Sequence, residues 1–138
     1  MTDILHPAAI NYLVVHCSDT PDDEFLTAAD IHQMHLGFGW HGVGYHRVIC
    51  RDGTLEMGRP DYWVGAHVYE HNQESLGVCL IGRHDFTDAQ MNALETLLKD
   101  WTARYPDAEI RGHCDFDNTT KTCPNFDARA WAKLRGLQ

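Results

Sequence analysis

The chain has 138 residues, 43% of them hydrophobic, and carries 20 Asp and Glu against 11 Lys and Arg. Such a length can bury one ordinary core but divides poorly into two, so we expect a single domain over 1–138, with its core at about 10–135. The acidic balance, without any basic cluster, argues against nucleic acid as a partner, because binding to phosphates needs a positive surface. It argues equally against attraction to anionic lipid.

Targeting signals and paired cysteines are both missing from the sequence. The first segment, MTDILHPAAINYLVVHCSD, lacks the positive start and the cleavage site of a secretory signal, so we expect synthesis in the cytoplasm. No stretch approaches the roughly 20 apolar residues of a membrane-spanning helix. The five cysteines lie singly, which argues against a disulfide framework. A chain of this size is compatible with a monomer, which is the state we expect.

Residue patterns predict alternating strands and helices. Short apolar runs bounded by turn residues indicate strands at 10–15, 45–50, 54–57, 77–81 and 108–111. Capping residues followed by apolar residues at helical spacing indicate helices at 27–38, 87–105 and 127–134. Thr87 and Gln90 form a capping-box pattern at the start of the middle helix. The order of elements predicts the α/β class, with a mixed central sheet flanked by helices.

Two histidines each follow a predicted strand. His16 comes after the first strand and His113 after the last, and Cys123 closes the loop that His113 opens. Sites in open sheets covered by helices tend to lie beyond strand ends, where such residues can meet. Two imidazoles and one thiolate make a zinc set that leaves the fourth position for water or substrate. Ten histidines and five cysteines allow many other sets of three, so this pattern alone leaves the choice open.

Strand alternation narrows that choice. Successive side chains of a strand point to opposite faces, so Cys17 should face away from whatever His16 faces. The same argument disfavours Cys114 beside His113. We expect both cysteines to be small buried hydrophobes. Histidines on the first helix or in loops without a partner motif are expected to be bystanders: His6, His32, His35 and His84.

Five segments carry a resemblance to a known family, and they occur in the same order from about Ile10 to Trp131. They are VVHCSDT, GVGYHRVICRDGTLEMGR, VGAHVYEHNQESLGVCLIG, FTDAQMNALETLL and RGHCDFDNTTKTCPNFD. Together they resemble the type-2 N-acetylmuramoyl-L-alanine amidases, and among them the small zinc lysozyme-amidases of T-odd phages. The resemblance implies the fold shared with peptidoglycan recognition proteins and one zinc ion. It also implies peptidoglycan as substrate, cut between the lactyl group of N-acetylmuramic acid and L-alanine.

The same resemblance assigns roles to five residues. Its metal ligands fall on His16, His113 and Cys123, and its catalytic residues fall on Tyr45 of GYH and Lys121 of KTCP. Amide hydrolysis has a use for each group. Zinc can lower the pKa of a bound water to about 7 and polarise the carbonyl. Lys121 would stabilise the developing oxyanion, and Tyr45 could orient the water and assist proton transfer.

Aromatic and amide side chains near these motifs suit a sugar-peptide ligand, which offers apolar faces and hydrogen-bonding groups. His67, in the GAH segment, is expected to contact the substrate or to support the metal site. The other candidates for substrate binding are Trp63, Asn72 and Trp40. His46, which should point away from the face that Tyr45 occupies, is expected to be structural.

Residue 79 separates two branches of the family. Cell-wall recycling amidases resemble the SLGVCLIG segment but have a Glu, which activates water, where Cys79 stands. The apolar setting of Cys79 predicts a packed thiol and leaves that duty to Tyr45. We therefore expect a phage or prophage endolysin that reaches the cell wall after holin-type release.

Three alternatives stay open. A recycling amidase would also lack a secretion signal. A recognition module without catalysis is disfavoured because such proteins lose the cysteine ligand that Cys123 provides. Phage amidases of this type can also restrain a phage RNA polymerase through an N-terminal extension, and here only nine residues precede the first predicted strand.

Overall fold

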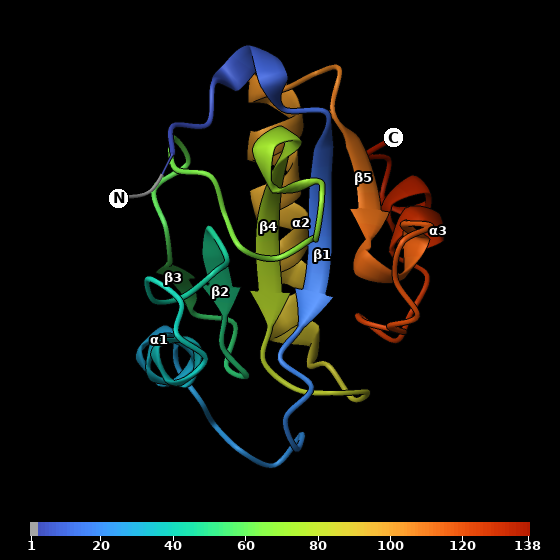
Figure 1. Cartoon of the computed structure of the whole chain (residues 1–138). Coiled ribbons are helices and arrows are strands. Elements are labelled where there is room, and N and C mark those ends of the chain that lie inside the picture. The colour runs from blue at the N-terminus through green and yellow to red at the C-terminus, as the bar shows by residue number, and fades with distance from the viewer. Residues whose placement is uncertain (1–2) are drawn as a thin grey trace.

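A computed structural model describes residues 3–138 and contains one five-stranded sheet with three α-helices (Figure 1). Residues 1 and 2, with which the expected domain and the N-terminal segment begin, lie outside the described residues. The strands are β1 (Tyr12–Cys17), β2 (Arg47–Ile49), β3 (Leu55–Met57), β4 (Ser75–Leu80) and β5 (Glu109–Gly112). The α-helices are α1 (Ala28–Gly37), α2 (Asp88–Arg104) and α3 (Ala128–Leu134).

The sheet has the order β3-β2-β4-β1-β5. β1 pairs in parallel with β4 and β5, and β2 pairs in parallel with β4 and antiparallel with β3. Helix α2 lies behind β4 and β1, whereas α1 and α3 lie toward the two edges (Figure 1). The predicted α/β class with a mixed, helix-flanked sheet is confirmed.

The predicted caps form at the helix starts. Thr87 Oγ1 accepts a hydrogen bond from the Gln90 backbone N–H at 3.1 Å, and Gln90 Oε1 accepts one from the Thr87 N–H at 3.0 Å. These bonds satisfy two N–H groups that a helix start leaves without partners. Thr27 caps α1 in the same reciprocal way with Asp30. Both helix starts therefore lie where the sequence places them.

The first strand begins two residues later than predicted. Ile10 is buried as expected of a strand residue, but its N–H donates to Pro7 O at 3.3 Å, which closes a short 3-10 turn. Strand pairing starts only at Tyr12 and continues to Cys17. His16 consequently lies within β1, near its carboxyl end.

Alternation along β1 divides its side chains between two faces. Leu13 and Val15 belong to the main core, where the sheet packs against Leu98 and Trp101 of α2. Val14 belongs to a separate cluster on the other face of the sheet. His16 shares that second face, where α1 covers only the β2 side of the sheet (Figure 1). The cleft that contains His16 lies on the part of this face that α1 leaves uncovered.

Across residues 3–138, no helix combines the length and the apolar character that crossing a bilayer requires.

Candidate metal centre and active site

His16, His113 and Cys123 converge at the carboxyl end of β1. Their candidate ligand atoms all lie within 4.8 Å of one another, and no other such group of three occurs in the described part of the chain. The His16 and His113 rings are 4.7 Å apart and both histidines are buried, while Cys123 is half-buried. The three residues that the sequence singled out therefore form a group that could hold a metal ion.

Strand register explains how two of the three meet. β5 runs parallel to β1 and pairs its last residue, Gly112, with Val15. His113, directly after β5, therefore comes to the level of His16, which follows Val15 in β1. The 116–122 loop then brings the chain back to Cys123, beside the two histidines. A hydrogen bond from the Cys114 N–H to Cys123 O, 2.9 Å long, holds the two ends of this loop together.

A backbone donor also reaches the cysteine ligand. The Cys17 N–H donates to Cys123 Sγ at 2.9 Å. An N–H group directed at sulfur favours the thiolate form, which is the form that binds metals. The end of β1 thus carries one candidate ligand, His16, and a backbone N–H that donates to another, Cys123.

Burial sets the protonation of the ligands. It lowers the pKa of His16, with further lowering from His67, His113 and Lys121. It also lowers the pKa of His113 to about 4. Both rings are therefore neutral at pH 7, with a lone pair free for a metal. The neighbouring Cys17 thiol and burial raise the pKa of Cys123, so a metal must displace a proton from this sulfur.

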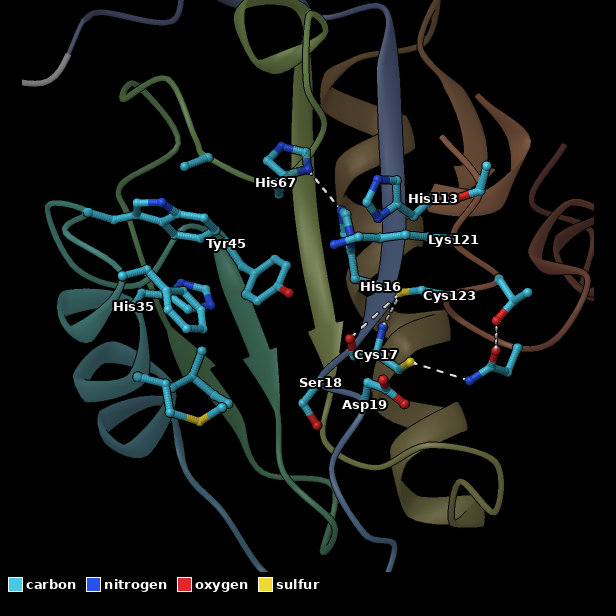
Figure 2. Close-up of a pocket in the computed structure, with 18 residues that line it drawn as sticks. His16, Cys17, Ser18, Asp19, His35, Tyr45, His67, His113, Lys121 and Cys123 are labelled. Atoms are coloured by element: carbon cyan, nitrogen blue, oxygen red, sulfur yellow. Dashed lines mark hydrogen bonds between the residues drawn. The ribbon is translucent and has the colours of Figure 1, made fainter. Parts of the chain in front are cut away.

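The three residues lie in a cleft of about 520 Å³. Figure 2 shows His35 and Tyr45 on one side and Lys121 and Cys123 on the other, with His16 between them. The rings of Tyr45 and His16 are 5.0 Å apart. Burial and the nearby Cys79 raise the pKa of Tyr45, so its phenol keeps its proton at neutral pH. The cleft thus brings the neutral phenol of Tyr45 and the side chain of Lys121 beside the three candidate ligands.

Of the four candidates for substrate contact, two line this cleft. They are His67, which is buried against His16, and Trp40, which is partly exposed and packs on His35 at 4.6 Å. Asn72 lines an adjoining lobe of about 370 Å³. Its Oδ1 accepts hydrogen bonds from the His67 and Val68 N–H groups, both at 2.9 Å. Asn72 therefore braces the loop that carries His67.

The structure does not bring Trp63 to the cleft. Trp63 is not among the described residues that line the cleft or its adjoining lobe. It forms a β-bridge with Ile4 in the N-terminal segment, and its carbonyl accepts a hydrogen bond from His46 Nε2 at 2.7 Å. The loop turns this residue toward the first residues of the chain, away from the ligand group.

Two expectations about cysteines need correction. Cys17 lines the same cleft as His16, because it is the last residue of β1 and the cleft extends around the strand end. Cys114 is exposed, because a 3-10 turn begins at His113 and ends the strand alternation there. Neither sulfur joins the group of ligand atoms. The predictions for Cys79 and His46 are confirmed, since both side chains are fully buried.

Sequence reasoning missed His35, which it treated as a bystander. Its ring lines the cleft, and its Nδ1 accepts a hydrogen bond from the Gly44 N–H at 2.8 Å. Nε2 must then carry the ring proton and is a donor. The signal was present in the sequence, because His35 lies on the apolar stripe of its helix, one turn after Ile31. A polar residue on a buried stripe faces the interior or a cavity.

Comparison with known proteins identifies the family of the chain. A family model described as N-acetylmuramoyl-L-alanine amidase matches residues 6–126. The chain belongs to this family. It is 40% identical over 132 residues to an endolysin of Enterobacteria phage T3, covering 90% of this chain and 86% of the relative.

Two solved structures share the fold. The N-acetylmuramoyl-L-alanine amidase LysC from Clostridium intestinale superposes with a TM-score of 0.81 at 26% identity, covering 98% of this chain and 89% of LysC. Peptidoglycan recognition protein-LE, solved with a monomeric diaminopimelic acid-type peptidoglycan, gives a TM-score of 0.79 at 23% identity, covering 99% and 84%. The second likeness shows the fold alone.

Proposed function

We propose that the chain is a zinc-dependent amidase that hydrolyses the bond between the lactyl group of N-acetylmuramic acid and the L-alanine of the peptidoglycan stem. The observation that carries this proposal is the meeting of His16, His113 and Cys123 with Tyr45 and Lys121 in one cleft. The family match and the likeness to a phage endolysin support it. The whole chain serves as a single catalytic domain.

The ligand group suits zinc by its chemistry. Zinc bonds to histidine nitrogen and cysteine sulfur are about 2.0 to 2.3 Å long, so the ligand atoms of one tetrahedral zinc lie about 3.3 to 3.6 Å apart. The three atoms lie within 4.8 Å of one another, so they would need to close only slightly around one ion. Two neutral imidazoles and one thiolate are borderline-soft ligands, which favour zinc over magnesium or calcium. When bound, zinc would supply the Lewis acidity that attack of water on an amide carbonyl requires.

Lys121 and Tyr45 supply the remaining charge and hydrogen bonds. The Lys121 ammonium is on the loop opposite Tyr45 and can meet negative charge that develops on the carbonyl oxygen. The Tyr45 phenol, whose raised pKa keeps it protonated, can donate a hydrogen bond to the attacking water or to the reacting carbonyl. Cys79 lies buried next to Tyr45 and offers no carboxylate, so Tyr45 holds and orients the water.

The cleft of about 520 Å³ and the adjoining lobe of about 370 Å³ are of the size that small-ligand sites have. Trp40 offers an apolar face at the junction of the two lobes, and Asn72 lies in the smaller lobe. Aromatic faces and amide groups are the contacts that sugars and short peptides use. Peptidoglycan is therefore the proposed partner, bound by a monomer.

The biological role that we propose is that of a phage or prophage endolysin acting on the cell wall. The 40% identity to the phage T3 endolysin supports this role. The packed thiol at Cys79, in place of the Glu of recycling amidases, points to the same branch.

The test is turnover on isolated sacculi. Zinc-loaded protein should release stem peptides, and a chelator should abolish the release. Lys121→Ala should keep its zinc and lose turnover, because the ammonium contacts the reacting carbonyl and is not a ligand. Binding of muropeptides by the zinc-loaded protein without any release would instead establish a recognition module.

A further inference from the structure

We propose that His67 is a positioning residue that fixes His16 in the tautomer whose Nδ1 faces the metal. This inference rests on the proposed function, since it concerns the zinc site of the amidase. It begins from a continuous line of hydrogen bonds that runs from the metal ligand into the protein. The members are His16, His67, Ser75 and the backbone carbonyl of His71.

The hydrogen bond that Ser75 makes to His71 O determines which atom donates in each of the other bonds. Ser75 Oγ donates its single hydrogen to His71 O at 2.8 Å. It can then only accept from His67 Nε2, which lies 3.3 Å away. His67 Nε2 therefore carries the ring proton, and His67 Nδ1 has the lone pair.

The same reasoning reaches the metal ligand. His67 Nδ1 lies 2.9 Å from His16 Nε2, a distance that needs one hydrogen between the two nitrogens (Figure 2). Because His67 Nδ1 accepts, His16 Nε2 must donate. The lone pair of His16 is thereby confined to Nδ1. Metal-ligating histidines commonly donate their other ring N–H to a partner in this way, which fixes ring orientation and raises ligand basicity.

Two glycines hold the His67 ring in place. A Cβ on Gly77 of β4 would lie 2.6 Å from His67 Nδ1, and a Cβ on Gly65 would lie 2.6 Å from His67 Cδ2. Glycine weakens the interior of a strand and is found there where another group approaches closely. The imidazole thus occupies a slot that only glycine leaves open.

Burial keeps the line intact. Ser75 is fully buried and the two rings are nearly so, so water does not compete for these hydrogen bonds. Asn72 fixes the start of the segment by accepting from the His67 backbone N–H. In this line, His16 Nε2 and both ring nitrogens of His67 have protein partners, and His16 Nδ1 is left for the metal.

The experiment measures zinc affinity and ring protonation in the full chain. His67→Leu fills the slot without an acceptor, and His67→Asn returns an amide oxygen near the position of Nδ1. We expect zinc binding, measured by competition with a chromophoric chelator, to weaken 10- to 100-fold in His67→Leu and to recover most of that loss in His67→Asn. His84→Ala, a change at an exposed histidine, should bind zinc as the wild type does.

The protonation states give a readout independent of activity. Nitrogen-15 NMR of the metal-free wild type should show His16 protonated at Nε2 and unprotonated at Nδ1. A proton on His16 Nδ1, or wild-type zinc affinity in His67→Leu, would overturn the proposal. Should His67→Leu fail to fold, Ser75→Ala provides a second test, because it keeps the His67 ring and removes the oxygen that accepts from His67 Nε2. Unchanged zinc affinity in Ser75→Ala would count equally against the proposal. None of these readouts needs turnover, so failure of the amidase proposal remains distinguishable.

Discussion

Replacing Gly77 with alanine should weaken zinc binding without touching a ligand. The new Cβ would lie 2.6 Å from His67 Nδ1 and 2.8 Å from Cε1 and Cγ, so the ring must retreat by roughly 0.8 Å to reach an ordinary contact of 3.4 Å. A shift of that size misaligns the 2.9 Å hydrogen bond to His16. We therefore expect a 10- to 100-fold loss of zinc affinity.

The effect of Gly77→Ala on stability is smaller. Overpacking of this kind costs about 1 to 3 kcal/mol, and alanine regains about 0.5 to 1 kcal/mol of backbone entropy. The metal-free variant should thus be less stable by about 1 kcal/mol. Chelator competition and urea unfolding measure the two quantities. Gly37→Ala is the matched control, because its Cβ meets nothing within 4 Å, and it should bind zinc normally. Zinc affinity within twofold of wild type in Gly77→Ala would refute the reasoning.

Three further predictions concern the ligands, the phenol and pH. Cys123→Ser should lose zinc after dialysis whereas Cys17→Ser should keep full stoichiometry, as metal analysis would show; the reverse pattern would exclude Cys123 as the ligand. Tyr45→Phe should retain zinc but lose about 10²- to 10⁴-fold in turnover on sacculi, and unchanged turnover would remove Tyr45 from the reaction. Acid should destabilise the metal-free protein, because burial lowers the pKa of His46 from 6.5 to about 4. The unfolded chain takes up this proton first, so the contribution of His46 to stability is complete above pH 6.5 and falls by about 3 kcal/mol as the pH drops to 4. His46→Asn should reduce the pH dependence of the free energy of unfolding across that range, and the part due to the buried His16, His67 and His113 should remain. An unchanged pH dependence, measured by urea unfolding, would contradict the assignment.

Most of the fold could be predicted because local signals and tertiary structure agree. The Thr87 and Gln90 capping box forms as the sequence predicts. The strands expected at 45–50 and 54–57 pair as β2 and β3, joined by a turn in which the Gly53 N–H donates to Cys50 O at 2.8 Å. The start of β1 was misplaced because Ile10 is apolar for a reason other than strand pairing, namely burial after a 3-10 turn. Strand order depends on long-range pairing, and no local pattern specifies it.

The site was predicted in part, for a physical reason. His16 and His113 could be found because they follow strands whose register places them side by side. Cys17 lines the cleft although it belongs to β1, because the cleft extends around the end of the strand. Alternation ends at His113, where a 3-10 turn leaves Cys114 exposed. The sequence predicts that His67 contacts the substrate or supports the metal site. Its hydrogen bond to His16 could not be predicted, because His67 reaches that residue from an irregular loop through a slot that two glycines open.

The central claim is that this cleft cuts an amide, and the products of sacculus digestion test it most directly. Mass spectrometry after digestion by the zinc-loaded protein should find stem peptides that begin with a free L-alanine amino group, alongside glycan strands of unchanged length. New reducing sugar ends, or no released peptide from a protein with full zinc occupancy, would contradict the account.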